Sequence, residues 1–399
     1  MKSLSHKALQ VKESSTLAIT AKAKALKLAG EDLIAFTAGE PDFDTPSHIK
    51  AAALAAADAG FTKYTATTGI LPLRKAICEK LKNDNGLNYQ PDQIVVSNGA
   101  KHALANIFTA LINEGDEIIF PAPYWLTYPE LATLAGGVPR IVETDKTSGY
   151  KPTASQLAAA ITPKTKAILI NSPNNPSGAV YSRDELQAIA DLAVKHDLYV
   201  ISDEIYEYLV YNGDAPHISI ASLGQEIFDR TIVVNGYSKS YSMTGWRVGY
   251  TASCQAIADV IGNIQSHQTS NINTLAQNAA VAAEEGGRQC VEDMRRDFEK
   301  RRNLMFDKIG GISGLNALRP DGAFYIFADI TAVLGKSANG VAINSGADFA
   351  DVLLDKQKVA IVPCADFGYK NHVRLSYAAG ESEITEGMDR IKAFVEGLA

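Results

Sequence analysis

The residues around Lys239 are of types that could hold an aldehyde and a phosphate together. Ser238 precedes Lys239, Arg247 follows further along, and the apolar run 231–235 comes just before them. A lysine beyond a buried strand can be desolvated, and the pKa of its amine can then fall far enough for a Schiff base to form with an aldehyde. A serine hydroxyl and a planar guanidinium both suit a phosphate. The combination indicates pyridoxal 5'-phosphate, whereas an isolated Ser-Lys pair would more simply be a loop lysine beside an exposed arginine.

Four other groups follow apolar runs, where ligands bind in open α/β sheets. Gly99 precedes a helical pattern whose N-terminus offers N–H groups and a positive dipole to a phosphate. Trp125 could stack on a planar ring, and Asn175 could hydrogen-bond a phenolic oxygen. Asp203 could pair with a protonated pyridine nitrogen, because a buried carboxylate needs a partner. Taken singly, each has an ordinary explanation: a strand-to-helix turn, packing, a tight turn or a helix cap.

Together these groups suggest one division of labour around a single cofactor. Lys239 would hold the aldehyde and Asp203 would keep the ring nitrogen protonated. Asn175 and Tyr206 would bond the ring oxygen, and Trp125 would stack on the ring. The residues expected around the phosphate are Gly99, Ala100, Lys101, Ser238 and Arg247.

The composition is that of an ordinary globular protein. Of the 399 residues, 46% are hydrophobic and 21% are charged, and the formal net charge is −7, which argues against nucleic acid or an anionic membrane as the main partner. The start of the chain lacks an apolar signal core, and no run approaches the length of a membrane span. Four scattered cysteines without a Cys-x-x-Cys spacing suggest free thiols and no metal site. We therefore expect a cytoplasmic enzyme.

The elements that must position these groups alternate along the middle of the chain. Short apolar runs without polar alternation are typical of strands buried on both faces of a mostly parallel sheet. Helical patterns separate them, one of which opens on the capping box Ser182-x-x-Glu185. This alternation predicts a doubly wound α/β core. The expected strands are 94–96, 117–120, 167–170, 198–201 and 232–234.

The C-terminal part has a different pattern. Runs at 324–327, 359–362 and 372–377 predict strands of a second, smaller sheet, and the segment around 285–305 predicts a long helix between the two lobes. A closing amphipathic helix is expected from Ile384 to Leu398. We expect a large cofactor-binding domain and a smaller α+β domain that closes on the substrate. Their predicted limits are 46–290 for the large domain, and 1–45 with 291–399 for the small one.

The chain resembles class I aspartate aminotransferases, which are fold type I pyridoxal phosphate enzymes, and it is most similar to the bacterial beta subgroup. The match runs nearly end to end, with signatures at 37–46, 171–178, 202–206 and 235–249. The resemblance implies that Gly39 lies over the substrate. It also implies that Tyr64 reaches the phosphate of a neighbouring subunit, so that a homodimer with shared active sites is expected.

The resemblance also assigns residues to the substrate. Arg374 would take the α-carboxylate, with bidentate geometry that suits a guanidinium; before that match, a surface arginine is an equal alternative. Thr16 and Lys101 would bind the distal carboxylate of a dicarboxylic amino acid. Some members of the family use the same pair to convert prephenate into arogenate, and Lys12 could add charge for the extra carboxylate of prephenate.

The expected reaction moves an amino group between L-aspartate or L-glutamate and 2-oxoglutarate or oxaloacetate in a ping-pong cycle. Lys239 would serve as the general base and acid. Small amino and oxo acids are thus the expected ligands. Two alternatives remain at this point: a carbon–sulfur lyase on the same scaffold, since fold does not fix function, and a non-catalytic regulator. The intact Lys239 disfavours the regulator.

Overall fold

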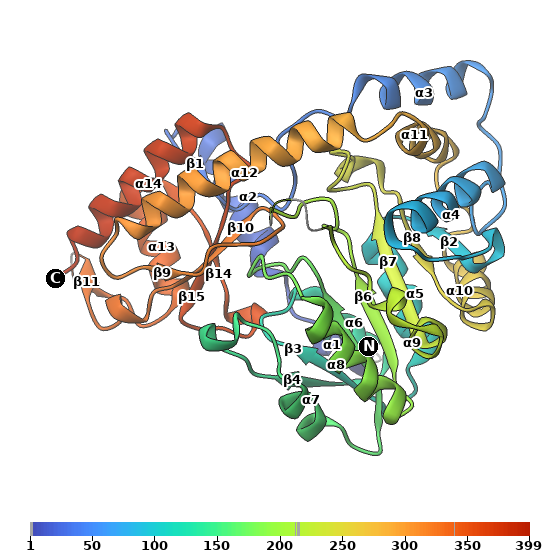
Figure 1. The fold of residues 1–399 in the computed structure, drawn as a ribbon. Helices are drawn as coiled ribbons and strands as arrows, with labels where there is room; N and C mark the ends of the chain where they lie inside the picture. The colour runs from blue at the N-terminus through green and yellow to red at the C-terminus, as the bar shows by residue number, and fades with distance from the viewer. Residues whose placement is uncertain (1–2, 212, 214–215, 339) are drawn as a thin grey trace.

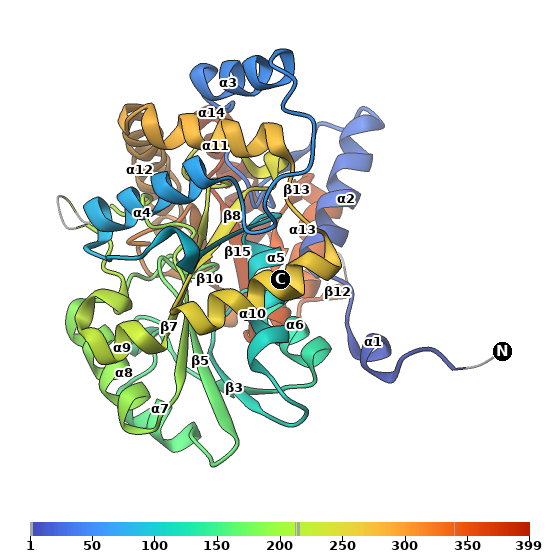
Figure 2. The same ribbon diagram turned by 90° about the vertical axis from the view of Figure 1, so that its right-hand side faces the viewer.

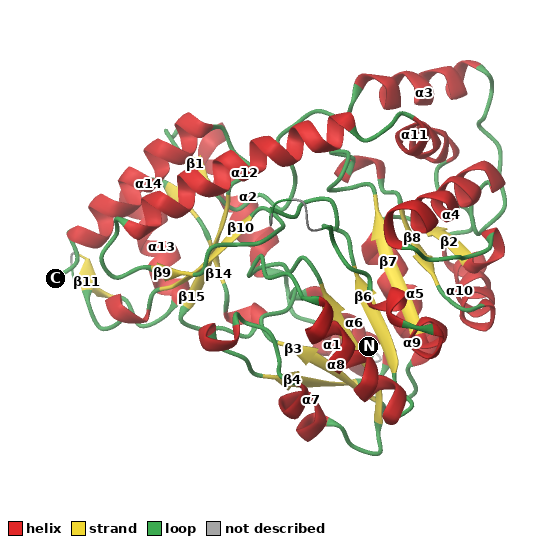
Figure 3. Cartoon of the chain, in the orientation of Figure 1, coloured by secondary structure: helices red, strands yellow, loops and turns green. Residues whose placement is uncertain are grey.

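A seven-stranded sheet forms the centre of the fold in the computed structural model, which describes residues 3–211, 213, 216–338 and 340–399. The strand order is β2-β8-β7-β6-β5-β3-β4 (Figures 1 and 3). β8 is antiparallel to both of its neighbours, and all other neighbouring strands are parallel. The strands are β2 Ile94–Ser97, β3 Glu117–Pro121, β4 Val138–Val142, β5 Thr165–Asn171, β6 Tyr199–Asp203, β7 Thr231–Gly236 and β8 Gly249–Ala252.

The five strands expected in this sheet are confirmed as β2, β3, β5, β6 and β7. The sequence patterns did not reveal β4 and β8. β4 is an edge strand whose side chains are mostly exposed, and it contains a proline, which weakens any strand signal. β8 begins at a glycine and is short, so its membership depends on pairing with β2 and β7 rather than on its own pattern.

Helices cover both faces of the sheet, because successive residues of a buried strand point to opposite sides. Ile118 and Phe120 of β3 pack in one cluster with α5, α6 and α10, whereas Ile119 packs with α7, α8 and α9 on the other face. The predicted doubly wound α/β core is therefore confirmed. The capping box of α8 also forms, with Ser182 and Glu185 each bonding the other's backbone N–H. The bounds are α5 Ala100–Leu111, α6 Thr127–Ala135, α7 Ala154–Ala160, α8 Arg183–Lys195, α9 Gln225–Arg230 and α10 Gln255–Gln268.

The N-terminal third supplies helices at the edge of the molecule. α3 and α4 both pack against α11 (Figure 2). α1 contacts α6, and α2 lies beside the short strands β13 and β14. No helix among the described residues is long and apolar enough to cross a bilayer. The helices of the N-terminal third are α1 His6–Gln10, α2 Ser15–Leu28, α3 Ser47–Asp58 and α4 Leu71–Asn85, and α11 spans Thr274–Glu285.

A second, antiparallel sheet has the order β14-β15-β10-β9 and is flanked by α12, α13 and α14 (Figure 1). The predicted long helix is confirmed as α12, although it begins after residue 285, which still belongs to α11. The predicted single strand 359–362 is wrong. β13 pairs with β1 and β14 pairs with β15, so Ile361 lies where the chain changes partner. The bounds are β1 Ile34–Ala35, β9 Asn316–Ala317, β10 Tyr325–Asp329, β11 Ser337–Ala338, β12 Val341–Ala342, β13 Val359–Ala360, β14 Val362–Pro363, β15 His372–Ser376, α12 Gln289–Gly310, α13 Gly346–Gln357 and α14 Glu381–Glu396.

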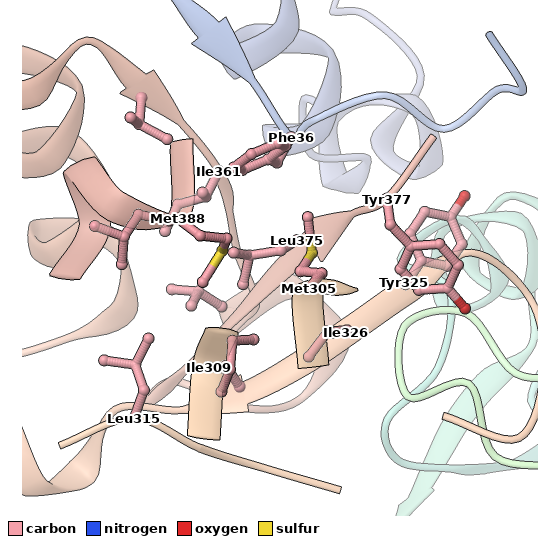
Figure 4. Close-up of a cluster of buried hydrophobic side chains, with 14 of the residues drawn as sticks. Phe36, Met305, Ile309, Leu315, Tyr325, Ile326, Ile361, Leu375, Tyr377 and Met388 are labelled. Carbon is pink, nitrogen blue, oxygen red and sulfur yellow. The ribbon is translucent and has the colours of Figure 1, made fainter. Parts of the chain in front are cut away.

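The core of this second lobe joins the two ends of the chain. Phe36 packs in one buried cluster with Met305 of α12, Ile326 of β10, Leu375 of β15 and Met388 of α14 (Figure 4). Burying a side chain of this size stabilises the fold by about 1.5–3 kcal/mol. The N-terminal segment is therefore fixed to the C-terminal lobe, and it can carry residues of α2 to the end of the large sheet.

Candidate active site

A cavity of about 450 Å³ lies where β5, β6 and β7 end, between the large sheet and the second lobe. α2 contributes a third side of its wall. Lining residues come from all three parts of the chain, so the site exists only in the folded protein. The cavity brings together Thr16, Gly39, Ala100, Lys101, Trp125, Asn175, Asp203, Tyr206, Ser238, Lys239, Arg247 and Arg374.

Three other residues named from the sequence lie outside this lining. Gly99 directly precedes it and caps α5. Tyr64 is 91% exposed on the outside of the chain. Lys12 is exposed, and its backbone N–H donates to Glu130. The roles of Tyr64 toward a second subunit and of Lys12 toward prephenate stay predictions.

Lys239 reaches the cavity from the loop that follows β7. Its Nζ donates a hydrogen bond to the carbonyl of Gly39 and lies 6.0 Å from the centres of the Tyr206 and Phe324 rings. Burial lowers the pKa of this amine to about 8, against the opposing charge of Glu40. A larger fraction of Lys239 is therefore unprotonated near neutral pH, which is the state that attacks an aldehyde.

Asp203 ends β6 and is held as a buried carboxylate. The Tyr128 hydroxyl donates to one carboxylate oxygen at 2.7 Å, and the Ile205 N–H donates to the other at 3.2 Å. Burial raises the pKa of Asp203 to about 6, although these two hydrogen bonds oppose the rise. A cationic ring nitrogen placed in the cavity would relieve the cost of this buried charge. The donor set therefore fits the pyridine ring of pyridoxal phosphate.

The start of α5 and the Arg247 side chain form a cradle for an anion. Gly99 has a φ of +81°, and a Cβ built there would lie 2.5 Å from Nη2 of Arg247. Arg247 is fixed by donating to the carbonyls of Thr244 at 2.9 Å and Asn98 at 3.3 Å. The first N–H groups of a helix lack intrahelical partners and attract phosphate. With Ser238 also in the lining, these groups fit a phosphate.

Arg374 comes from β15 and is 1% exposed, so a surface arginine is ruled out. Its guanidinium donates to the Asn175 amide oxygen at 3.0 Å and to the Thr37 carbonyl at 3.1 Å. The ring of Tyr325 lies 4.3 Å from the guanidinium carbon. This is a preorganised cation inside the cavity, and a carboxylate is the ligand that best matches its planar fork.

Several residues that sequence reasoning missed support the named ones. The Tyr325 hydroxyl bonds the Tyr206 hydroxyl at 2.9 Å. Asn171 accepts the Asn175 N–H at 2.9 Å and donates to the Asp203 carbonyl, so it fixes the ends of β5 and β6 together. For Tyr128 a signal existed, because it comes only three residues after Trp125; in the structure the two rings meet edge to face at 5.4 Å. The role of Tyr325 depends on contact between the lobes and left no signal in the chain.

Lys101 and Thr16 add further polar groups to the cavity lining. Nζ of Lys101 lies 4.8 Å from the Trp125 ring centre, and burial, with the nearby Arg247 charge, lowers the pKa of this lysine. The Thr16 hydroxyl at the start of α2 is buried without a hydrogen-bond partner among the described residues, and Thr16 lines the same cavity as Lys101. A cation and an unpaired hydroxyl group in one cavity suit a second carboxylate.

A doubly wound sheet with the cofactor-type lysine beyond β7 and a smaller lobe over the strand ends is the architecture of fold type I transferases. The profile of the family described as aminotransferase class I and II matches residues 31–391. The chain belongs to this family, whose members in general depend on pyridoxal phosphate. The resemblance stated from the sequence is thereby confirmed.

Named relatives extend over the whole chain. An aspartate aminotransferase of Bacillus sp. (strain YM-2) is 47% identical over 383 residues, which cover 96% of each chain. A probable aspartate/prephenate aminotransferase of Aquifex aeolicus (strain VF5) is 46% identical over 399 residues and 100% of both chains. The crystal structure of the aspartate aminotransferase from Rhizobium meliloti matches with a TM-score of 0.96 at 39% identity, covering 100% of both chains.

Proposed function

We propose that this aminotransferase uses pyridoxal 5'-phosphate to move the amino group between L-aspartate or L-glutamate and 2-oxoglutarate or oxaloacetate. The observation that carries the proposal is one cavity that holds Lys239, Asp203 and Arg374 together. An amine, a buried carboxylate and a buried guanidinium match an aldehyde, a ring nitrogen and an α-carboxylate respectively. The names of the relatives support aspartate as the amino donor.

Each part of the proposed cofactor has a counterpart in the chain. Lys239 would hold the aldehyde, Asp203 the ring nitrogen, and the start of α5 with Ser238 and Arg247 the phosphate. Asn175 and Tyr206 line the same cavity and would bond the ring oxygen. When bound, pyridoxal phosphate supplies an electron sink for the bonds broken at the substrate α-carbon.

The residues then divide the chemical work. The Lys239 amine, with its pKa lowered to about 8, would act as the general base that takes the proton from the substrate α-carbon and as the general acid that gives it back. Asp203 would hold the proton on the ring nitrogen throughout. Trp125 would cover the ring, and Gly39 would lie over the substrate, excluding water from the reacting atoms.

Substrate choice would follow from the two carboxylate sites. Arg374 would bind the α-carboxylate by a paired hydrogen bond. Lys101 and Thr16 line the same cavity and would bind the distal carboxylate, so dicarboxylic amino acids should be preferred. The exposed Tyr64 would complete the phosphate site of a second subunit, which makes a homodimer with shared active sites part of the proposal. A cytoplasmic location remains part of it as well.

Prephenate is a second candidate acceptor, favoured by the relative named for aspartate and prephenate. With L-aspartate as the amino donor, turnover should be compared for two acceptors, 2-oxoglutarate and prephenate. We expect clear turnover with 2-oxoglutarate. Turnover with prephenate that depends on Lys12, as tested with Lys12→Gln, would support arogenate formation, and absence of prephenate turnover would remove that activity.

Arg374→Lys is expected to lower kcat/KM for L-aspartate by about 10²-fold while pyridoxal phosphate still binds, because a lysine keeps the charge but loses the planar fork. Arg390→Lys is a matched control, since Arg390 is an arginine of α14 paired with Glu386 on the surface. Steady-state kinetics with both variants measure the effect. Equal kcat/KM values in the two variants would contradict the role of Arg374.

A further inference from the structure

A second buried carboxylate, Glu204, lies on the side of the central sheet opposite the cavity. It directly follows Asp203, and its backbone N–H continues the ladder by donating to the Val234 carbonyl at 2.9 Å. Successive residues of a strand point to opposite faces, so Asp203 faces the cavity and Glu204 faces away. The Glu204 side chain is 0% exposed, and Oε1 accepts hydrogen bonds from the hydroxyl groups of Ser202 at 2.8 Å and Ser219 at 2.7 Å.

The other oxygen of Glu204 meets an imidazole. Nε2 of His217 lies 3.2 Å from Oε2, and the side chain of His217 is 4% exposed. The two atoms are at ion-pair distance without the alignment of a good hydrogen bond, and attraction between opposite charges tolerates such a geometry. Burial alone would raise the pKa of Glu204, but the His217 charge and the bonds from the two serines lower it. The charged form of the Glu204 carboxylate is therefore stabilised by His217 together with the two serine hydroxyl groups.

The neighbouring titratable groups do not replace His217 in this role. Burial raises the pKa of Tyr89 and Tyr250, which both feel the Glu204 charge, so they stay neutral. Glu207 carries its own counter-ion in Lys80. On the cavity side, the groups that face Asp203 are Tyr128, Tyr206 and Lys239. The Glu204 charge also disfavours ionisation of Asp203. Among the causes that raise the pKa of Asp203, it is the largest after burial.

We propose that Glu204 and His217 form a positioning pair for Asp203, in which His217 offsets the Glu204 charge and lets Asp203 stay ionised where the ring nitrogen of the cofactor would bind. A bare carboxylate on the adjacent residue would repel the Asp203 charge through the sheet. The inference rests on the proposed binding of the cofactor ring nitrogen by Asp203. It deepens that proposal by naming what keeps the carboxylate ready to accept a pyridinium.

Three variants separate a charge effect from a packing effect: His217→Gln, Glu204→Gln and the double variant. The measurement is the dissociation constant of pyridoxal phosphate for the cofactor-free full chain between pH 5 and 8.5. In the wild-type protein, affinity should fall as the pH drops through about 6, where Asp203 takes up a proton. In His217→Gln this fall should begin about one pH unit higher, which makes binding up to tenfold weaker on the acid side.

The double variant decides between the two explanations. Removing the Glu204 charge as well should return the pH dependence of affinity toward that of the wild type, because neither charge of the pair then remains. A purely structural role predicts that the double variant binds the cofactor more weakly than either single variant. That result, or an unshifted pH dependence in His217→Gln, would overturn the proposal. A wild-type protein that does not bind pyridoxal phosphate would instead refute the proposed function.

A measurement on the wild-type protein covers the case in which the His217 variants do not fold. Nitrogen-15 NMR of labelled histidine side chains distinguishes imidazole from imidazolium. The proposal requires one of the seven histidines to be imidazolium in the pH range over which Asp203 is ionised and the cofactor binds. Seven neutral histidines in that range would overturn the proposal.

Discussion

Replacement of Lys239 by alanine should lower turnover of L-aspartate by at least ~10⁴-fold, because the variant loses the group that moves the proton at the α-carbon. The cavity otherwise keeps its cradle at the start of α5 and its carboxylate at Asp203. Lys239→Ala should therefore still bind pyridoxal phosphate, though not covalently. Loss of activity together with retained cofactor would distinguish a chemical role from a folding defect.

The measurement is single-turnover kinetics with L-aspartate, combined with equilibrium binding of the cofactor. Lys300→Ala is a suitable control, since Lys300 is an exposed lysine of α12 that does not line the cavity. It should behave like the wild-type protein. Turnover close to wild type in Lys239→Ala would defeat the assignment of Lys239.

Replacement of Asp203 by asparagine should lower turnover by about 10²–10³-fold, because a neutral amide does not hold a proton on the ring nitrogen and the electron sink is weakened. The amide can still accept the hydrogen bond from Tyr128, so the fold of the site should persist. The same change should stabilise the cofactor-free protein. Activity and stability should therefore move in opposite directions, as expected for a charge buried for function.

The sign of the stability effect follows from the pKa of Asp203, which is raised from 3.8 to about 6 in the folded protein. The folded state holds the proton more tightly, so the carboxylate costs nothing below the ordinary pKa and destabilises the fold increasingly as the pH rises to about 6. Above that pH the cost levels off at about 3 kcal/mol. The melting temperature of cofactor-free Asp203→Asn should thus be higher than that of the wild type at pH 7 and equal to it near pH 4.

Asp58→Asn, at the exposed end of α3, is the control for a change of net charge in the same experiment. It should leave the melting temperature within error of the wild type at both values of pH. If Asp203→Asn and this control have the same melting temperature at pH 7, the buried Asp203 carboxylate does not destabilise the cofactor-free fold, which would contradict the prediction.

Much of the site could be predicted from the sequence because its groups follow strands with unmistakable patterns. The run 198–201 is buried on both faces, so Asp203 had to lie at a strand end, and parallel strands bring such ends to one edge of a sheet. The same reasoning places Lys239 after the run 232–234. Glu185 likewise marked the start of α8 through its capping box with Ser182.

Other features could not be predicted from the strand patterns, because they depend on contacts between distant parts of the chain; Arg374 was named only through the family resemblance. Tyr325 and Arg374 belong to the second lobe and reach the cavity only after that lobe packs on the strand ends. Arg374 alternates with apolar residues in β15, as a surface arginine would, yet it is fully buried beside Tyr325. The antiparallel insertion of β8 depends equally on its partners, since its own pattern is short and begins at Gly249.

The most direct test of the account is the visible absorption spectrum of the purified protein with pyridoxal phosphate during titration with L-aspartate, without any oxo acid. We predict that the yellow band of the cofactor bound to Lys239 is replaced by the absorption of the amino form, which would establish the half-reaction and the preference for an acidic substrate together. A yellow band that L-aspartate leaves unchanged would contradict the proposed substrate while retaining the cofactor site.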